Sequence, residues 1–163
     1  MNLNLRYPPT PEFAAQHAEL VLAPAKSVSG VDLDYSPRSL AEVDKIIESM
    51  RQDGVDAEQI AETLFAFGCY VGEVFVRNNN ARWTNAADTA MKDLAGFPIV
   101  LELGPDNICN PIGKVFKRMI NGGEDGLEFF YRVFTTAKGE NDRNSGTPTR
   151  NRRRGFWAKL FRR

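Results

Sequence analysis

The chain has 163 residues, of which 42% are apolar, and it carries 21 basic and 21 acidic side chains. This length suits one well-filled core and is short for two domains. The formal neutrality hides a division, because residues 150–163 hold seven basic side chains and no acid, which leaves the rest of the chain near −7. Such a split bears on which partners are attracted rather than on how the core packs.

Membrane spans and secretory signals are not expected from this sequence. The longest apolar stretch, residues 64–76, is shorter than the roughly 20 residues that cross a bilayer. The first nine residues lack the apolar core of a secretory signal. We therefore expect a cytoplasmic protein, in which Cys69 and Cys109 are reduced structural thiols, since no metal or redox spacing accompanies them. The single histidine, His17, falls on the apolar side of a predicted helix and is expected in the core.

Two helices are expected in the first third of the chain. A threonine followed by a proline predicts a helix over residues 11–23, and a connector follows over 24–35. The serine and proline at 36–37 repeat the start signal, and Gly54 ends this second helix. Its apolar residues recur at helical spacing: Leu40, Val43, Ile47 and Met50.

The third expected helix is the most informative element. Asp56 and Gln59 form a capping-box pattern, so the helix is expected to begin there. Residues 60–76 are apolar nearly all round, which is typical of a helix at the centre of a domain. Gly68 and Gly72 each cost about 1 kcal/mol of helix propensity relative to alanine, and they predict the close approach of another backbone.

A small sheet and two further helices are expected in the second half. Residues 97–103 predict a buried strand and residues 108–109 a short returning strand. These belong to an antiparallel sheet of two or three strands. A helix beginning at Asn110-Pro111 and a last helix carry their apolar residues in register: Ile112, Val115, Phe116, Met119 and Ile120, then Leu127, Phe130, Tyr131 and Phe134.

The elements together predict an α+β fold, mostly helical, with about five helices and the small antiparallel sheet. A globular acidic domain is expected at residues 1–136. The polar composition of residues 137–151 predicts a flexible linker. Residues 152–163 form a basic amphipathic tail.

The tail has the composition of a segment that attaches to a surface. If the residues after Gly155 form two helical turns, four bulky apolar side chains gather on one side. Such a short helix is marginal alone in water and should order only on a surface. Three surfaces stay open: an anionic membrane, an acidic protein face such as residues 31–62, with nine acids against three bases, and nucleic acid. The candidate contact residues are Arg152, Arg153, Arg154, Phe156, Trp157, Lys159, Leu160, Phe161, Arg162 and Arg163.

One group of polar residues lies near the end of the central helix. Glu73 and Arg77 are spaced four apart, as in a helical ion pair at the edge of the core. The functional alternative is that they line a pocket together with Tyr70 and Trp83.

A second group opens the helix that follows the sheet. Asn110 is interpreted as a helix cap, and Lys114 and Lys117, which Arg118 follows, as exposed lysines. The alternative is an anion site at the helix N-terminus. The sequence has no histidine paired with a nucleophile, no metal-ligand cluster and no spaced carboxylate pair. We therefore predict no catalytic residue, metal or cofactor, and do not expect an enzyme.

Residues 33–134 resemble an uncharacterised family of small bacterial cytoplasmic domains. The resemblance implies a cytoplasmic bacterial protein with an α+β fold, and the family has no established activity to carry over. Separately, Gly155-Phe156-Trp157-x-Lys159-Leu160-Phe161 is similar to the C-terminal endings of diverse bacterial proteins. The motifs that carry the first resemblance are Asp34-Tyr35-Ser36-Pro37-x-Ser39-Leu40, Gly68-x-Tyr70-x-Gly72-Glu73-x-x-x-Arg77 with Trp83, and Asn110-Pro111-x-x-Lys114-Val115-x-Lys117-Arg118.

These observations favour a non-catalytic interaction protein, of an immunity or regulatory kind. Its acidic face would bind a basic protein partner, for example a toxin, and its tail would attach weakly to the inner face of the membrane. One alternative is a nucleic-acid accessory protein that uses the tail as a phosphate clamp. Another is a small-ligand or enzymatic domain centred on Tyr70, Glu73 and Arg77.

Overall fold

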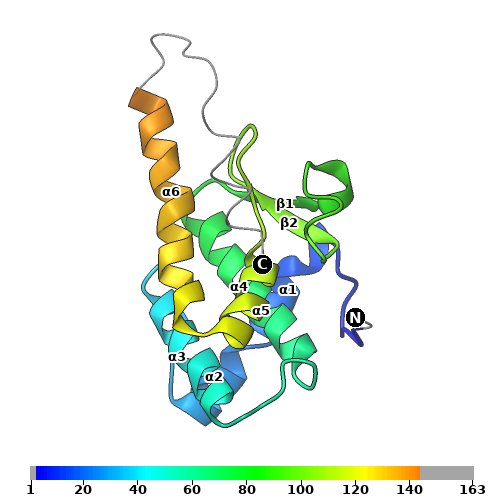
Figure 1. Ribbon diagram of the computed structural model, residues 1–163, viewed down its shortest axis with the longest axis vertical. Helices are drawn as coiled ribbons and strands as arrows, with labels where there is room; N and C mark the ends of the chain where they lie inside the picture. Colours follow the sequence, from blue (N-terminus) through cyan, green and yellow to red (C-terminus); the bar gives the residue numbers. More distant parts are fainter. Residues whose placement is uncertain (1–2, 144–163) are drawn as a thin grey trace.

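The computed structural model describes residues 3–143, so the predicted basic tail lies outside the described residues, as does most of the predicted linker. The α+β fold is confirmed: the helices pack together, and one small antiparallel sheet lies at one side of them (Figure 1). In chain order the elements are a 3₁₀ turn at Pro11–Phe13, α1 at Ala14–Glu19, α2 at Leu22–Ser29, α3 at Ser39–Gln52, α4 at Ala61–Asn78, β1 at Arg82–Asn85, a 3₁₀ turn at Ala86–Asp88, β2 at Ile99–Glu102, β3 at Ile108–Cys109, α5 at Pro111–Asn121, a 3₁₀ turn at Gly123–Asp125 and α6 at Leu127–Arg143.

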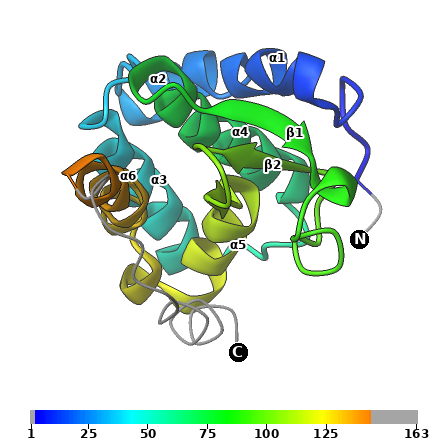
Figure 2. The same cartoon turned by 90° about the horizontal axis from the view of Figure 1, so that it is seen from above.

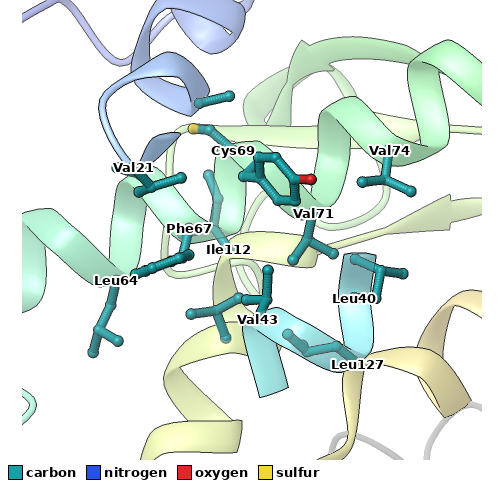
Figure 3. Close-up of a cluster of buried hydrophobic side chains, with 14 of the residues drawn as sticks. Val21, Leu40, Val43, Leu64, Phe67, Cys69, Val71, Val74, Ile112 and Leu127 are labelled. Atoms are coloured by element: carbon teal, nitrogen blue, oxygen red, sulfur yellow. The ribbon is translucent and has the colours of Figure 1, made fainter. Parts of the chain in front are cut away.

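The central position of α4 is confirmed. Figure 2 shows α4 in the middle of the molecule, with α1 on one side and α5 on the other, and these two helices make its main contacts. Every residue of α4 from Leu64 to Phe75 is buried. Side chains from α2, α3, α5 and α6 converge on it in the core shown in Figure 3. Within residues 3–143, every helix is too short or too polar to traverse a lipid bilayer.

The two glycines of α4 make room for different neighbours. A Cβ atom on Gly68 would lie 2.5 Å from the Cα of Ile112, so here the predicted close approach of a backbone, that of α5, is confirmed. At Gly72 the neighbour is instead the ring of Trp83, whose Cζ2 atom would lie 2.1 Å from an added Cβ. Both positions therefore need glycine for packing, which explains why the helix tolerates their low propensity.

The sheet has three strands in the order β1-β2-β3, antiparallel throughout. Trp83 of β1 pairs with Leu101 of β2, and Leu101 pairs in turn with Cys109 of β3. The central strand, β2, is buried from Ile99 to Leu101, as its unbroken apolar run predicts.

Three boundaries differ from the sequence predictions. The first predicted helix is interrupted near Leu20, and α2 then continues to Ser29, through residues that were expected to form a connector. Pro24 is the third residue of α2, where its missing N–H costs no internal hydrogen bond, so it does not break the helix. The pattern at Asp56 does not cap α4: its carboxylate accepts from the Glu58 amide in a turn, and the helix begins five residues later.

One further prediction is corrected in the second half of the chain. Ile120 was placed on the apolar face of α5, but it is 66% exposed, because this face ends at Met119. Helix α6 extends to Arg143, so its end overlaps the range 137–151 for which the sequence predicts a linker.

The cysteines and the histidine lie in the core, as predicted. Cys69 and Cys109 are buried free thiols, and burial raises the pKa of both. His17 is buried against the ring of Phe65, and a ring nitrogen lies 3.3 Å from the carbonyl oxygen of Pro8. Burial lowers its pKa, which favours the neutral ring.

Candidate functional site

An open apolar groove lies between α2, α3 and α4. Its volume is about 270 Å³. Pockets that hold small molecules usually measure roughly 300–1,000 Å³, so this groove suits a few side chains of a partner better than a whole ligand. Its apolar lining includes Val21, Pro24, Val28, Ile46, Met50 and Phe67.

The hollow arises from small residues where the helices meet. Ala25 of α2 and Ala66 of α4 both line the groove, and neither side chain is long enough to fill the space between the helices. Val28, on the outer wall of the groove, is 85% exposed. An exposed apolar wall beside a hollow is a feature of protein docking sites.

One end of the groove is acidic. Among the described residues that line it, Glu62 is the single charged one. The backbone amide of Asn4 donates to the Glu62 carboxylate at 3.0 Å, which lowers the pKa of Glu62 and keeps it ionised. The loop between α3 and α4 adjoins the groove. Met50, near the end of α3, and Glu62, near the start of α4, both line the groove, so each end of the loop lies close to it.

This loop carries three exposed carboxylates. Asp53, Asp56 and Glu58 have no ion pair with any other residue in the described part of the chain. Together with Glu62 they form what we call the acidic rim. The rim is therefore a cluster of negative charge for which residues 3–136, whose side chains the structure describes, supply no ion-pair partner.

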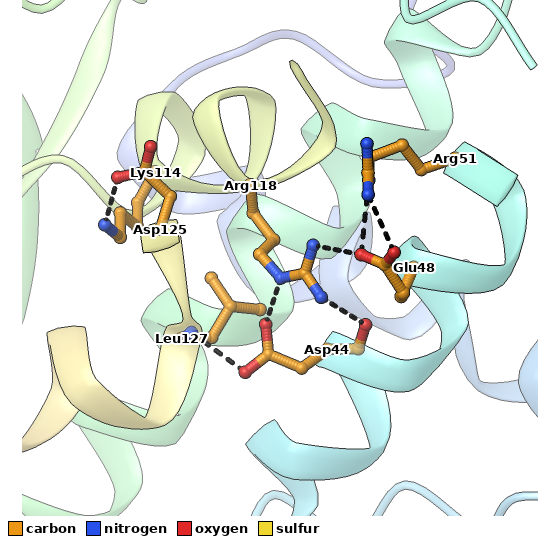
Figure 4. Close-up of polar contacts among 7 residues, drawn as sticks. All are labelled: Asp44, Glu48, Arg51, Lys114, Arg118, Asp125 and Leu127. Atoms are coloured by element: carbon orange, nitrogen blue, oxygen red, sulfur yellow. Dashed lines mark hydrogen bonds and ion pairs between the residues drawn. The ribbon is translucent and has the colours of Figure 1, made fainter. Parts of the chain in front are cut away.

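Four of the five other acids of residues 31–62 form ion pairs within the domain, and the fifth, Asp34, is exposed and accepts from the Ser36 amide. Asp44 and Glu48 of α3 both bind Arg118 of α5, at 2.8 Å each, as Figure 4 shows. Hydrogen bonds from Arg51 and Arg118 lower the pKa of Glu48 to about 2. Asp32 pairs with Lys26, and Glu42 pairs with Lys45. The predicted acidic face is thus narrower than the sequence count suggests.

The group predicted around Glu73 is brought together, but as packed side chains. The Glu73–Arg77 ion pair is confirmed at 3.4 Å, and the indole N–H of Trp83 donates to the same carboxylate at 3.0 Å. Tyr70 is fully buried. Its hydroxyl oxygen accepts from the Tyr35 amide at 2.9 Å.

These contacts hold an unusual backbone conformation. Tyr35 has φ of 60°, in the left-handed region that tyrosine rarely adopts. The Tyr70 hydroxyl binds its amide, the Asn78 side chain donates to its carbonyl at 2.9 Å, and the Arg77 guanidinium lies 3.5 Å from the centre of its ring. The first two motifs of the family resemblance therefore meet in one contact network. None of the residues in this network lines the groove.

The residues predicted at the start of α5 form a cap and a buried ion pair. Asn110 accepts a hydrogen bond from the Gly113 amide at 2.8 Å, which confirms the cap. The expected exposure of Lys114 is wrong, because its side chain is buried, and Arg118 is buried as well. The Lys114 ammonium lies 2.5 Å from Asp125, and with Asn110 it lines a small cavity of about 100 Å³ beside α6.

The sequence analysis did not find the groove. Its outer wall, α2, lies in residues that were expected to form a connector, so Val28 was not assigned to any helical face. A helical spacing of apolar residues does continue through Val21, Ala25 and Val28, and this signal could have revealed α2.

In the part of the chain that the structure describes, no three His, Cys, Asp or Glu side chains are grouped so as to hold a metal ion. Comparisons with protein-family models, with curated proteins and with solved structures find no match to this chain. The proposals below therefore rest on the chain's own residues.

Proposed function

We propose that this is a non-catalytic interaction protein, of an immunity or regulatory kind, that binds a basic protein partner. The observation that carries the proposal is the acidic rim beside an open apolar groove. A carboxylate cluster without internal counter-ions attracts a basic partner, and the groove removes apolar side chains of that partner from water.

The geometry narrows the chemistry of the partner's contact segment. A groove between helices accommodates an amphipathic helix with bulky apolar residues on one face. The rim lies at one end of the groove, so basic residues are needed at one end of that helix. A basic toxin neutralised by this domain is one partner with such a surface.

The basic tail gives the protein a second contact, with an anionic membrane surface. Each basic residue near such a surface contributes about 1 kcal/mol, and the four bulky apolar residues add to it. Ordering the segment opposes this gain, so attachment is weak and reversible. The protein is then cytoplasmic, with a fraction on the inner face of the membrane.

The groove is tested with a defined probe. We expect a fluorescent 14-residue peptide, with leucines on one helical face and lysines on the other, to bind the full chain. Replacing the three loop acids (Asp53→Asn, Asp56→Asn, Glu58→Gln) should weaken binding about tenfold, since exposed ion pairs contribute about 0.2–1 kcal/mol each.

Two controls accompany this measurement. A peptide of the same composition in scrambled order should bind much more weakly, because it lacks the apolar face. Replacing three exposed acids of other loops (Asp93→Asn, Asp106→Asn, Glu124→Gln) should leave the affinity nearly unchanged. Equal weakening by both triple variants would show only general charge attraction and would contradict a site at the groove.

The tail is tested separately by sedimentation with vesicles that contain anionic lipid. The full chain should sediment with them at low salt, and a Trp157→Asp, Phe161→Asp variant should not. Equal sedimentation of both forms would contradict membrane attachment. Loss of vesicle binding together with salt-sensitive binding of single-stranded DNA would favour the nucleic-acid alternative.

A further inference from the structure

The groove leaves apolar surface in contact with water, and one segment of this chain has the composition to cover it. Among the described residues, Val28 on its wall is 85% exposed, and α2, α3 and α4 leave the hollow open. Residues 144–163 lie outside the described part of the chain and include a cluster of large apolar residues.

The segment 156–161 fits the contact chemistry derived above. In a helix, Phe156, Trp157, Leu160 and Phe161 share one face, because they recur at i, i+1, i+4 and i+5. This is the spacing with which a helix fills a groove between other helices. A helix this short is marginal in water and gains stability by docking.

The charges of the segment and the groove are opposite. Residues 150–163 carry seven basic side chains and no acid, while Glu62 is the one charged residue among the described residues that line the groove. Residues Asp53, Asp56 and Glu58 extend the negative charge along the adjoining loop. A basic segment in the groove would therefore supply the counter-ions that residues 3–136 do not.

The chain is long enough to bring the segment to the groove. The Leu127 amide at the start of α6 donates to Asp44 of α3 at 2.9 Å, so α6 begins beside the helix that carries Ile46 and Met50. To reach the groove, the segment after Arg143 must return along α6, which is about 24 Å long, and then cross α3, which adds about 10 Å. The thirteen peptide units from Arg143 to Phe156 span up to about 43 Å when extended, which exceeds this sum.

We propose that the segment 156–161 of this chain docks in the apolar groove and competes there with the partner. The inference rests on the proposed function, since it concerns the regulation of the same groove. A segment held in the groove is withdrawn from the membrane, and a partner that takes the groove releases it. Partner binding would then increase membrane attachment.

The test follows the emission of Trp157, obtained as the difference between the spectra of the full chain and its Trp157→Phe variant. This subtraction leaves Trp83 unaltered. We expect the Trp157 emission to be shifted to shorter wavelength than that of a free peptide of residues 150–163. The Val28→Lys substitution in the groove should move it back to the free-peptide position.

The control is Ile120→Lys, which also replaces an exposed β-branched helical residue but lies outside the groove. It should leave the emission of Trp157 unchanged. A shift that persists on dilution shows docking within one chain, and a shift lost on dilution shows docking into a second copy. Emission identical to that of the free peptide, or insensitive to Val28→Lys, would overturn the inference.

A second measurement separates this inference from the proposed function. If the segment competes for the groove, the Phe156→Asp, Phe161→Asp variant should bind the leucine–lysine peptide severalfold more tightly than the full chain does. If the peptide binds both forms equally and Val28→Lys still abolishes its binding, the groove is a partner site without this competition. If the peptide does not bind either form, the proposed function fails as well.

Discussion

The two sides of the α3–α4 pair differ in how their charges and surfaces are used. On the side of α5 and α6, Asp44 and Glu48 are matched by Arg118, and Gly68 lets α5 pack directly on α4. On the side of α2, the helices leave a groove, and no ion pair joins the acidic rim to a base among residues 3–136. The first side stabilises the domain, while the second leaves unpaired carboxylates and an open apolar groove for a partner.

The largest effect should come from removing Arg118 on the packed side. Arg118→Ala leaves Asp44 without its cation and Glu48 with Arg51 alone, and breaking a buried pair in this way costs about 3–5 kcal/mol. We expect urea denaturation to show a loss of this size in the free energy of unfolding. Arg51→Ala removes an exposed partner of the same Glu48 and should cost below about 1 kcal/mol. Similar losses for both variants would show that the buried Arg118 stabilises the domain no more than the exposed Arg51 does.

A smaller loss is expected from filling the contact between α4 and α5. Gly68→Ala places a methyl group against the backbone of Ile112, and such overpacking costs about 1–3 kcal/mol beyond the propensity gained. Thr63→Ala, on the groove side of the same helix, meets no such neighbour and should change the stability by less than about 0.5 kcal/mol. Thermal unfolding of the two variants checks the difference.

Acid should destabilise the domain partly through Glu48. Its pKa is lowered to about 2 by Arg51 and Arg118, so in this range the unfolded chain takes up a proton more readily than the folded one. The stabilisation is complete above the unfolded pKa, near 4.5, and is lost as the pH falls from there towards 2. Denaturation curves at several pH values should show a shallower loss for Glu48→Gln. An identical pH dependence would show that the pairing with Arg118 contributes little.

The smallest effect on stability is expected at the acidic rim. The triple variant Asp53→Asn, Asp56→Asn, Glu58→Gln alters only exposed side chains, so its free energy of unfolding should stay within about 0.5 kcal/mol of the unaltered chain. Because the same variant should lose affinity for the basic peptide, the rim is distinguished as a surface for binding. A large loss of stability would instead show that these acids stabilise the folded domain.

The sequence predicted the elements whose signals are local. The all-round apolar character of α4 indicated its central place, and Asn110 followed by Pro111 marked the start of α5. The start of α4 was placed too early, because Asp56 can satisfy a nearby amide in a turn as well as at a helix cap. Such alternatives have similar local energies, and the packing of Ala61 onward decides between them.

The candidate site was harder to predict because it depends on pairs of residues far apart in the chain. Nothing near Arg118 in the sequence indicates that it will pair with two acids of α3, which lie 74 and 70 residues earlier. The number of acids in residues 31–62 can be read from the sequence. Which of them remain free to bind a partner depends on the ion pairs that form in the folded domain. The groove, likewise, depends on Ala25 and Ala66, which are far apart in the chain and line the same hollow.

One carboxylate couples three helices. Asp44 of α3 binds the guanidinium of Arg118 in α5 with one oxygen and the Leu127 amide at the start of α6 with the other (Figure 4). Neither helix can detach without depriving the other of part of its anchor. The carboxyl-terminal half of the domain should therefore open as a single cooperative unit in hydrogen exchange, with α5 and the start of α6 losing protection together.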